Sequence, residues 1–173
     1  MVHGHFHLIS PTTRRIVCVC ASCSSWYGQQ NDRSLVPVPR VARELLSFRL
    51  TNAQWQGLCL PADLAFCYWS SLDAGAVAVS PTRDGVIETR LPEGPWGDIV
   101  AGNRPLQEMA ADVEGLLVHR VPTSACRLPL YVIMPIDVCY QLVGILRAYW
   151  RGDGGGDEVW TEVDGFLSRL RGQ

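Results

Sequence analysis

The sequence predicts an α+β fold: an antiparallel-rich sheet with C-terminal helices, preceded by a short zinc-ribbon-like hairpin and knuckle. Its 173 residues are 47% hydrophobic and 18% charged, which is typical of a folded chain with a substantial core. Short β-type runs separated by turn residues fill the middle of the chain, and long helical periodicity follows only near its end. We therefore expect a Cys/His-rich hairpin and knuckle over residues 1–34 and an α+β domain over residues 35–173.

The N-terminal part is expected to begin with a β-hairpin. His5–Ile9 and Arg15–Cys20 are strand-like segments on either side of Pro11-Thr12, which has the composition of a turn. The following segment, Ala21–Tyr27, is expected to form a knuckle or one turn of helix.

The α+β domain is expected to contain several strands and two short helices. Thr51 and Gln54 have the spacing of a capping box, so a short helix should begin after Thr51, and Trp96–Ala101 predicts a second one. Strands are expected at Leu64–Ser70, Ala76–Ser80, Val86–Arg90, Leu116–Val121 and Leu130–Met134. Asp84-Gly85 predicts a tight hairpin between the second and third of these strands.

Two amphipathic helices are expected to close the chain. The first should begin at Asp137 as N-cap and the second at Asp157. Their apolar stripes at helical spacing are Val138, Leu142, Ile145 and Tyr149 in the first, and Val159, Val163, Phe166 and Leu170 in the second. Such stripes typically pack on a sheet, so we expect the helices on one side of it.

Composition excludes some classes of function. The formal net charge is −2, so the chain has no overall basic field that would hold nucleic acid or anionic lipid. No apolar run reaches the roughly 18 residues of a membrane span, and the N-terminus lacks the apolar core of an export signal. We therefore expect a cytoplasmic protein whose seven cysteines are reduced.

The N-terminal Cys and His residues form the constellation with most chemical content. His3, His5 and His7 alternate, so a strand places their side chains on one face. Cys20 and Cys23 are separated by two residues, which is the spacing of half a zinc site, and Cys18 precedes them at strand spacing.

The hairpin register sharpens this hypothesis. If Pro11-Thr12 is a two-residue loop, His5 lies opposite Cys18 and His3 opposite Cys20 on one face. The other face then carries Phe6, Leu8, Val17 and Val19, which can pack on the core.

Zinc requires four N or S ligands in a tetrahedron about 2.0–2.3 Å from the ion. Cys20 and Cys23, with two of Cys18, His5 and His3, could supply them. Iron is the alternative metal, because thiolates also hold single iron ions and clusters that transfer electrons. A cluster of reduced thiols without metal is the other interpretation that the residues leave open.

The remaining cysteines are interpreted as structural. Cys139 falls in the first turn of a helix, where the dipole can lower a thiol pKa, but a nucleophile needs a base and His119 is the one histidine outside the N-terminus. We expect Cys139 to be buried, and likewise Cys59, Cys67 and Cys126. Gly152–Gly156 lacks the Lys-Ser/Thr of a phosphate loop and predicts a flexible turn.

Several segments resemble a known family. They are Phe48–Trp55 (FRLTNAQW), Pro135–Gly144 (PIDVCYQLVG), Tyr149–Gly152 (YWRG) and Glu158–Val163 (EVWTEV). The chain is similar over nearly its whole length to an actinobacterial domain family of unknown function whose genes occur in clusters for nickel–iron uptake hydrogenases. The family pattern has an upstream Cys-x-x-Cys pair, a His-x-His segment and a Cys-x-Cys-x-x-Cys segment. His5-Phe6-His7 and Cys18–Cys23 match its later parts.

The resemblance implies a context rather than a reaction. It favours a non-catalytic accessory protein that assists hydrogenase assembly or maturation, with a hydrogenase subunit or maturation factor as partner. An iron-binding redox module that uses the N-terminal thiolates is the alternative, and an enzyme that uses Cys139 or a metal-bound water ranks third. The upstream Cys pair of the family pattern is missing here, so we expect either a true start at Met1 or a knuckle that precedes it.

Overall fold

The computed structural model describes residues 5–29, 34–82, 84–121, 128–152 and 156–171. Its strands are β1 (Phe6–Ile9), β2 (Ile16–Val19), β3 (Val36–Pro37), β4 (Arg43–Glu44), β5 (Leu64–Ser70), β6 (Gly75–Thr82), β7 (Gly85–Arg90), β8 (Glu114–His119) and β9 (Leu130–Pro135). Its helices are α1 (Ala21–Gly28), α2 (Asn52–Gly57), α3 (Glu93–Gly102), α4 (Arg104–Gln107), α5 (Ile136–Tyr149) and α6 (Gly156–Arg171). No helix in the described ranges combines the length and apolar character that a membrane crossing requires.

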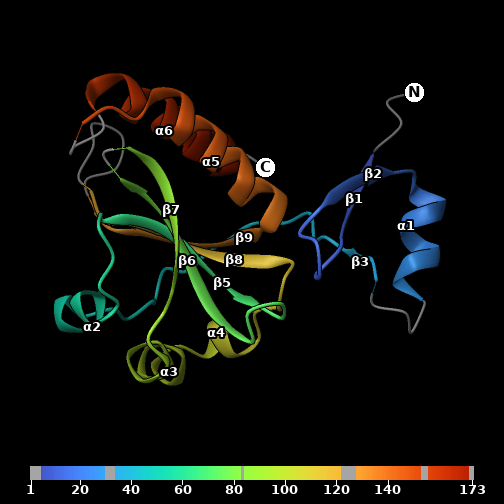
Figure 1. Ribbon diagram of the computed structural model, residues 1–173, viewed down its shortest axis with the longest axis horizontal. Coiled ribbons are helices and arrows are strands. Elements are labelled where there is room, and N and C mark those ends of the chain that lie inside the picture. Colours follow the sequence, from blue (N-terminus) through green and yellow to red (C-terminus); the bar gives the residue numbers. More distant parts are fainter. Residues whose placement is uncertain (1–4, 30–33, 83, 122–127, 153–155, 172–173) are drawn as a thin grey trace.

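A six-stranded antiparallel sheet forms the centre of the molecule, in the order β4-β9-β8-β5-β6-β7 (Figure 1). Each neighbouring pair is antiparallel, and β5, β6 and β7 follow one another as a meander. The predicted α+β class, with an antiparallel sheet and two C-terminal helices, is confirmed.

Helices cover both faces of this sheet, so the prediction of helices on one side was wrong. In Figure 1, α5 and α6 lie across the upper face, and α2, α3 and α4 lie below. The cause is visible in the central strands, because β5 is buried at six of its seven positions rather than at alternate ones. A strand buried on both sides needs a covering layer on each side.

Residue size distinguishes the two faces. The face under α5 and α6 carries large side chains, including Phe66, Tyr68 and Val79. On the opposite face, strands β5 and β6 present small side chains, which pack with Trp55, Trp96 and Ile99 of the short helices. These small residues are Ala65, Cys67, Ala76 and Ala78. Because small side chains leave room above the strand, the two tryptophans can fill the space and lie 7% exposed.

Helix α5 follows β9 without a loop. Pro135 ends the strand and serves as N-cap, and the backbone N–H of Ile136 donates to the carbonyl of Val113. The prediction that Asp137 is the N-cap was therefore wrong, since Asp137 lies within the first helical turn. Its carboxylate accepts a hydrogen bond from the N–H of Val138 and remains close to the positive end of the helix dipole.

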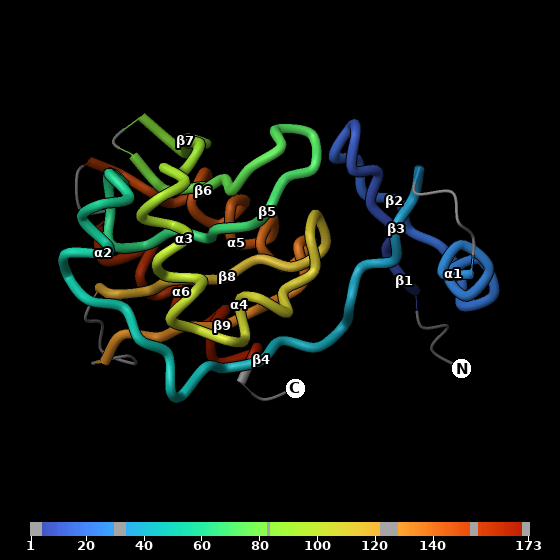
Figure 2. The backbone as a smooth tube through the Cα atoms, turned by 90° about the horizontal axis from the view of Figure 1, so that it is seen from below, coloured from blue at the N-terminus to red at the C-terminus, as the bar shows by residue number. Residues whose placement is uncertain are grey.

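The N-terminal unit is a separate three-stranded sheet in the order β2-β1-β3. Strand β3 joins it at Val36–Pro37, just beyond the predicted boundary at residue 34. Helix α1 packs on β1 and β3, and Figures 1 and 2 place it on the side of this sheet that faces away from the six-stranded sheet.

Apolar contacts and an arginine attach this unit to the rest of the molecule. Ile9 and Val38 are buried in the core cluster that lies under α5 and α6. At the tip of the hairpin, Arg14 forms ion pairs with Asp73 and Glu88. Its guanidinium also lies 5.9 Å from the ring centre of Tyr68, which is buried. Together these contacts hold the hairpin tip against β5, the turn that follows it and β7.

Gly115 in β8 provides a test of how closely α5 packs on the six-stranded sheet. A Cβ atom at this position would lie 2.9 Å from Sγ of Cys139, a buried atom of α5. We predict that Gly115→Ala lowers the free energy of unfolding by about 1–3 kcal/mol, because α5 must move away from the sheet. Chemical denaturation with the far-UV circular dichroism signal would measure it.

Two further variants separate the close contact from a general effect of alanine. Adding Cys139→Ala should recover part of the loss caused by Gly115→Ala, since the opposing sulfur is gone. On the exposed side of α5, Gly144→Ala should instead stabilise the protein by up to about 1 kcal/mol, because its Cβ would meet nothing within 4 Å apart from its chain neighbours and the local helix backbone. Additive effects of Gly115→Ala and Cys139→Ala would contradict the contact.

Candidate metal centre

The N-terminal hairpin has a register two residues away from the predicted one. His7, rather than His5, lies opposite Cys18, and Phe6 lies opposite Val19. The reason is a longer loop: the N–H of Ser10 donates to the carbonyl of Arg15, and Arg14 closes the turn with a positive φ of 55°. A shift of two residues preserves the faces, so the His and Cys side chains still share one face of the hairpin.

His5, His7 and Cys18 form a compact group of donor atoms. One donor atom from each side chain lies within 4.8 Å of the others. The two imidazole rings are 5.1 Å apart, centre to centre, and tilted by 52°. Cys18 and His5 are exposed and His7 is partly buried, so a metal ion can reach the group from solvent. Among the described residues this is the set whose chemistry and spacing match a transition-metal site.

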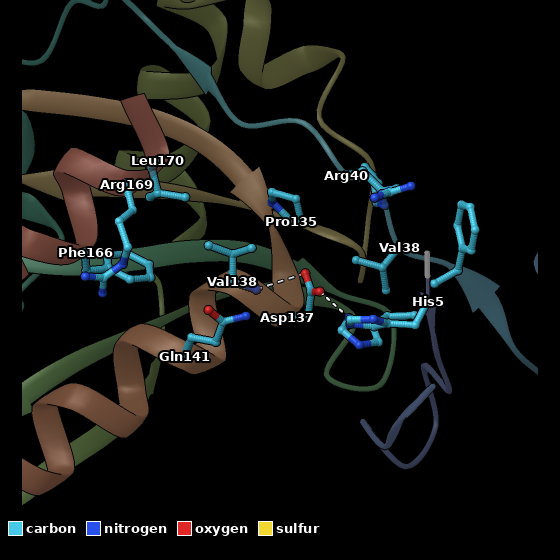
Figure 3. Close-up of a pocket in the computed structure, with 13 residues that line it drawn as sticks. His5, Val38, Arg40, Pro135, Asp137, Val138, Gln141, Phe166, Arg169 and Leu170 are labelled. Carbon is cyan, nitrogen blue, oxygen red and sulfur yellow. Dashed lines mark hydrogen bonds and ion pairs between the residues drawn. The ribbon is translucent and has the colours of Figure 1, made fainter. Parts of the chain in front are cut away.

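Asp137 extends the group into the α+β domain. Its Oδ2 lies 2.5 Å from Nδ1 of His7, across the boundary between the N-terminal sheet and α5 (Figure 3). The side chains of His7 and Asp137 are 25% and 15% exposed. In a neutral histidine that donates its Nδ1–H to a carboxylate, Nε2 has its lone pair available for a metal.

Cys20 and Cys23 form a second, neighbouring pair at the start of α1. Cys20 is the N-cap of this helix, and Cys23 lies one turn further on. The backbone N–H and the thiol of Cys23 stabilise the Cys20 thiolate and lower the pKa of Cys20, whereas the same thiol pair raises the pKa of Cys23. Both side chains are exposed. The structure thus places this pair beside the His5, His7 and Cys18 group but outside it.

The other predicted residues have mixed outcomes. His3 and Cys126 lie outside the described residues. Cys67 and Cys139 are fully buried, as predicted, and burial raises the pKa of Cys67 to about 12 and that of Cys139 well above its usual range. Cys59 was expected to be buried but is exposed, since it follows α2 in a turn with a positive φ of 55°.

A cavity of about 410 Å³ adjoins the candidate metal group. Figure 3 shows His5 on one side of it and Gln141, Phe166 and Arg169 of α5 and α6 on the other. Its walls come from the N-terminal unit, from the segment after β3 and from both C-terminal helices. Small-molecule sites favour such boundaries between structural units.

The burial of the thiols predicts their order of reaction. At pH 8, iodoacetamide should modify Cys18, Cys20, Cys23 and Cys59 of the metal-free protein, with Cys20 ahead of Cys23 because of its lowered pKa. Cys67 should react only after denaturation, since a pKa of about 12 leaves roughly one thiolate in 10⁴ at pH 8, and the same holds for Cys139. Peptide mass mapping over time measures each rate. Rapid modification of Cys67 or Cys139 in the native protein would contradict the structure.

Comparison with known proteins identifies a family. No curated protein and no solved structure matches the chain. A family model described as "Family of unknown function (DUF5947)" matches residues 1–173. The chain therefore belongs to the DUF5947 family over its whole length.

Proposed function

We propose that this protein is a non-catalytic accessory protein that holds a zinc ion at His5, His7 and Cys18 and assists the assembly or maturation of a nickel–iron hydrogenase. This proposal rests on one observation: the three donor side chains lie close together, and Asp137 orients the ring of His7. The site thus includes side chains from the N-terminal hairpin and from the first turn of α5.

The donor set suits zinc. Zinc accepts both imidazole nitrogen and thiolate sulfur, at about 2.0–2.1 Å and 2.3 Å respectively, so donors of a tetrahedral site are ~3.3–3.8 Å apart. Donor atoms within 4.8 Å of one another need to approach by about one ångström, which side-chain rotation on an exposed hairpin can supply. An iron centre of four thiolates draws less support, because the group contains one cysteine.

The contact between His7 and Asp137 supports a structural effect of the metal. Metal-bound histidines usually donate their second ring N–H to a carboxylate, which fixes the ring and makes it a better ligand. Here that carboxylate belongs to α5, whereas the proposed ligands belong to the N-terminal hairpin: His5 directly before β1, His7 in β1 and Cys18 in β2. Metal binding would therefore strengthen the attachment of the N-terminal unit to the α+β domain.

The hydrogenase context is supported by the resemblance of Phe48–Trp55 and Pro135–Gly144 to the family whose genes accompany nickel–iron uptake hydrogenases. Pro135–Gly144 also contains Asp137, the residue that joins the candidate metal group to the domain. The segment that carries the resemblance thus includes the residue on which the proposed site depends.

Metal analysis of the protein, purified anaerobically without a histidine tag, tests the metal site. We expect about one zinc per chain and no visible colour. Cys18→Ser and His7→Ala should each remove most of the bound metal, because either change leaves only two ligands of the group. Asp137→Asn should retain one zinc but weaken the affinity by about 10–100-fold in a chelator competition.

Matched variants make this result specific. Cys59→Ser removes an exposed thiol far from the site, and Asp157→Asn removes a carboxylate from the first turn of α6, so both should bind zinc as the unmodified protein does. Iron with thiolate charge-transfer bands would favour the redox-module alternative. A metal-free protein that gains no zinc on titration would refute the site.

Affinity purification from the native cell tests the partner. A C-terminally tagged chain, isolated without oxygen, should recover a hydrogenase subunit or a hydrogenase maturation factor in stoichiometric amount. The recovered amount should fall with Cys18→Ser if the metal-bound form is the form that docks. Recovery of the tagged chain alone, from cells that contain assembled hydrogenase, would refute the assembly role.

A further inference from the structure

The cavity beside the candidate metal group has the features of a binding site for a small anion. It measures about 410 Å³, which lies within the usual range for small-molecule pockets. Val38, Val138 and Phe166 contribute apolar surface to it, and Val38 and Phe166 are buried. Polar side chains from three separate elements also line the cavity: Arg40 from the segment after β3, Gln141 from α5 and Arg169 from α6.

Two arginines determine the charge of the cavity. Arg40 belongs to the segment after β3 and Arg169 to α6, and Figure 3 shows them on opposite sides of the cavity. Among the ion pairs that the structure gives between described residues, none involves either arginine. The one carboxylate in the cavity wall, that of Asp137, is engaged by His7. With two arginines against one aspartate, the described wall of the cavity is net positive in a chain whose formal net charge is −2.

Arg40 is also held in place. Its guanidinium carbon lies 4.9 Å from the ring centre of Phe6, in a cation–π contact. Such stacking orients the planar fork of an arginine, and less side-chain freedom is then lost when an anion binds. On the opposite side, Gln141 lies one turn after Asp137 on α5 and adds an amide to the cavity wall.

We propose that this cavity binds a small organic dicarboxylate, with one carboxylate paired to Arg40 and the other to Arg169. Planar guanidinium groups match carboxylates in a bidentate manner, and two of them on opposite walls select a ligand with an acid group at each end. The apolar surface between them accommodates the carbon chain of such a ligand. An inorganic anion would leave this surface uncovered.

A metal ion in the candidate group would strengthen the preference of the cavity for a dicarboxylate. His5 and His7 belong both to the cavity wall and to the metal group, so an ion held there adds positive charge at the edge of the cavity. Three protein ligands leave one position of a tetrahedral ion for an outside donor, and carboxylate oxygen is an accepted zinc ligand. This part of the inference rests on the proposed function, whereas the pairing with the two arginines does not.

Calorimetric titration of the full-length, zinc-loaded protein tests the proposal. The probes are succinate and glutarate, with butyrate and inorganic phosphate as comparisons. We expect the dicarboxylates to bind more tightly than either comparison. Arg40→Gln and Arg169→Gln should each weaken dicarboxylate binding by about tenfold or more, since each removes one bidentate pair. Arg147→Gln is the matched control, because Arg147 is exposed on α5 and outside the cavity wall.

The outcomes separate this inference from the proposed function. Metal binding is measured on the same variants, and both cavity variants should keep their zinc. If zinc binds but no dicarboxylate does, or if Arg40→Gln and Arg169→Gln bind as Arg147→Gln does, the cavity proposal is refuted and the metal site stands. If the arginine-dependent binding occurs equally in protein without metal, the cavity proposal stands and the contribution of the metal is refuted. Equal binding of butyrate, phosphate and succinate would refute selection for two acid groups.

Discussion

Burial of the central strands on both faces is the constraint on which the rest of this structure depends. Strand β8 is buried along its whole length and β5 along nearly all of it, so neither face of the sheet can be left to solvent. The chain meets this requirement with α5 and α6 on one face and with α2, α3 and α4 on the other. Because α5 must begin directly at the end of β9 to cover its face, the first turn of α5 is held at the edge of the sheet. Asp137 owes its position beside the N-terminal hairpin to this geometry.

The N-terminal unit depends on the domain that it contacts. Its helix α1 contains no buried residue, and its strands have two to four residues each. So small a sheet buries too little apolar surface to be stable alone. Ile9 and Val38 supply buried contacts, Arg14 supplies ion pairs, and His7 supplies the contact with Asp137. A bound metal would act on a unit with few buried residues of its own, where a modest binding energy can add to its stability.

Local signals in the sequence predicted much of the fold but little of the site. Thr51 and Gln54 predicted the capping box that the structure shows, and Leu64–Ser70 predicted the bounds of β5. The hairpin register was not accessible in this way, because it depends on a turn closed by Arg14 in a left-handed conformation. Asp137 could not be predicted as a partner of His7, since 130 residues separate the two in the chain and only the folded topology brings them together. Sequence alternation did place His7 on the face that carries Cys18, and that was the available indication of its place in the candidate metal group.

The two-residue difference in hairpin register has a consequence for how this family can vary. Strand side chains alternate between faces, so adding or removing residues in pairs at the Pro11–Arg14 turn changes which His meets which Cys but keeps all donors on one side. A single inserted residue would instead turn one strand over and remove its donors from the group. If the candidate group binds a metal, natural variation in the length of this turn should therefore come in even steps wherever the group is retained. Whether the turn differs by an even or an odd number of residues can be seen in the sequence of any relative, and an odd difference would indicate that the group has been lost.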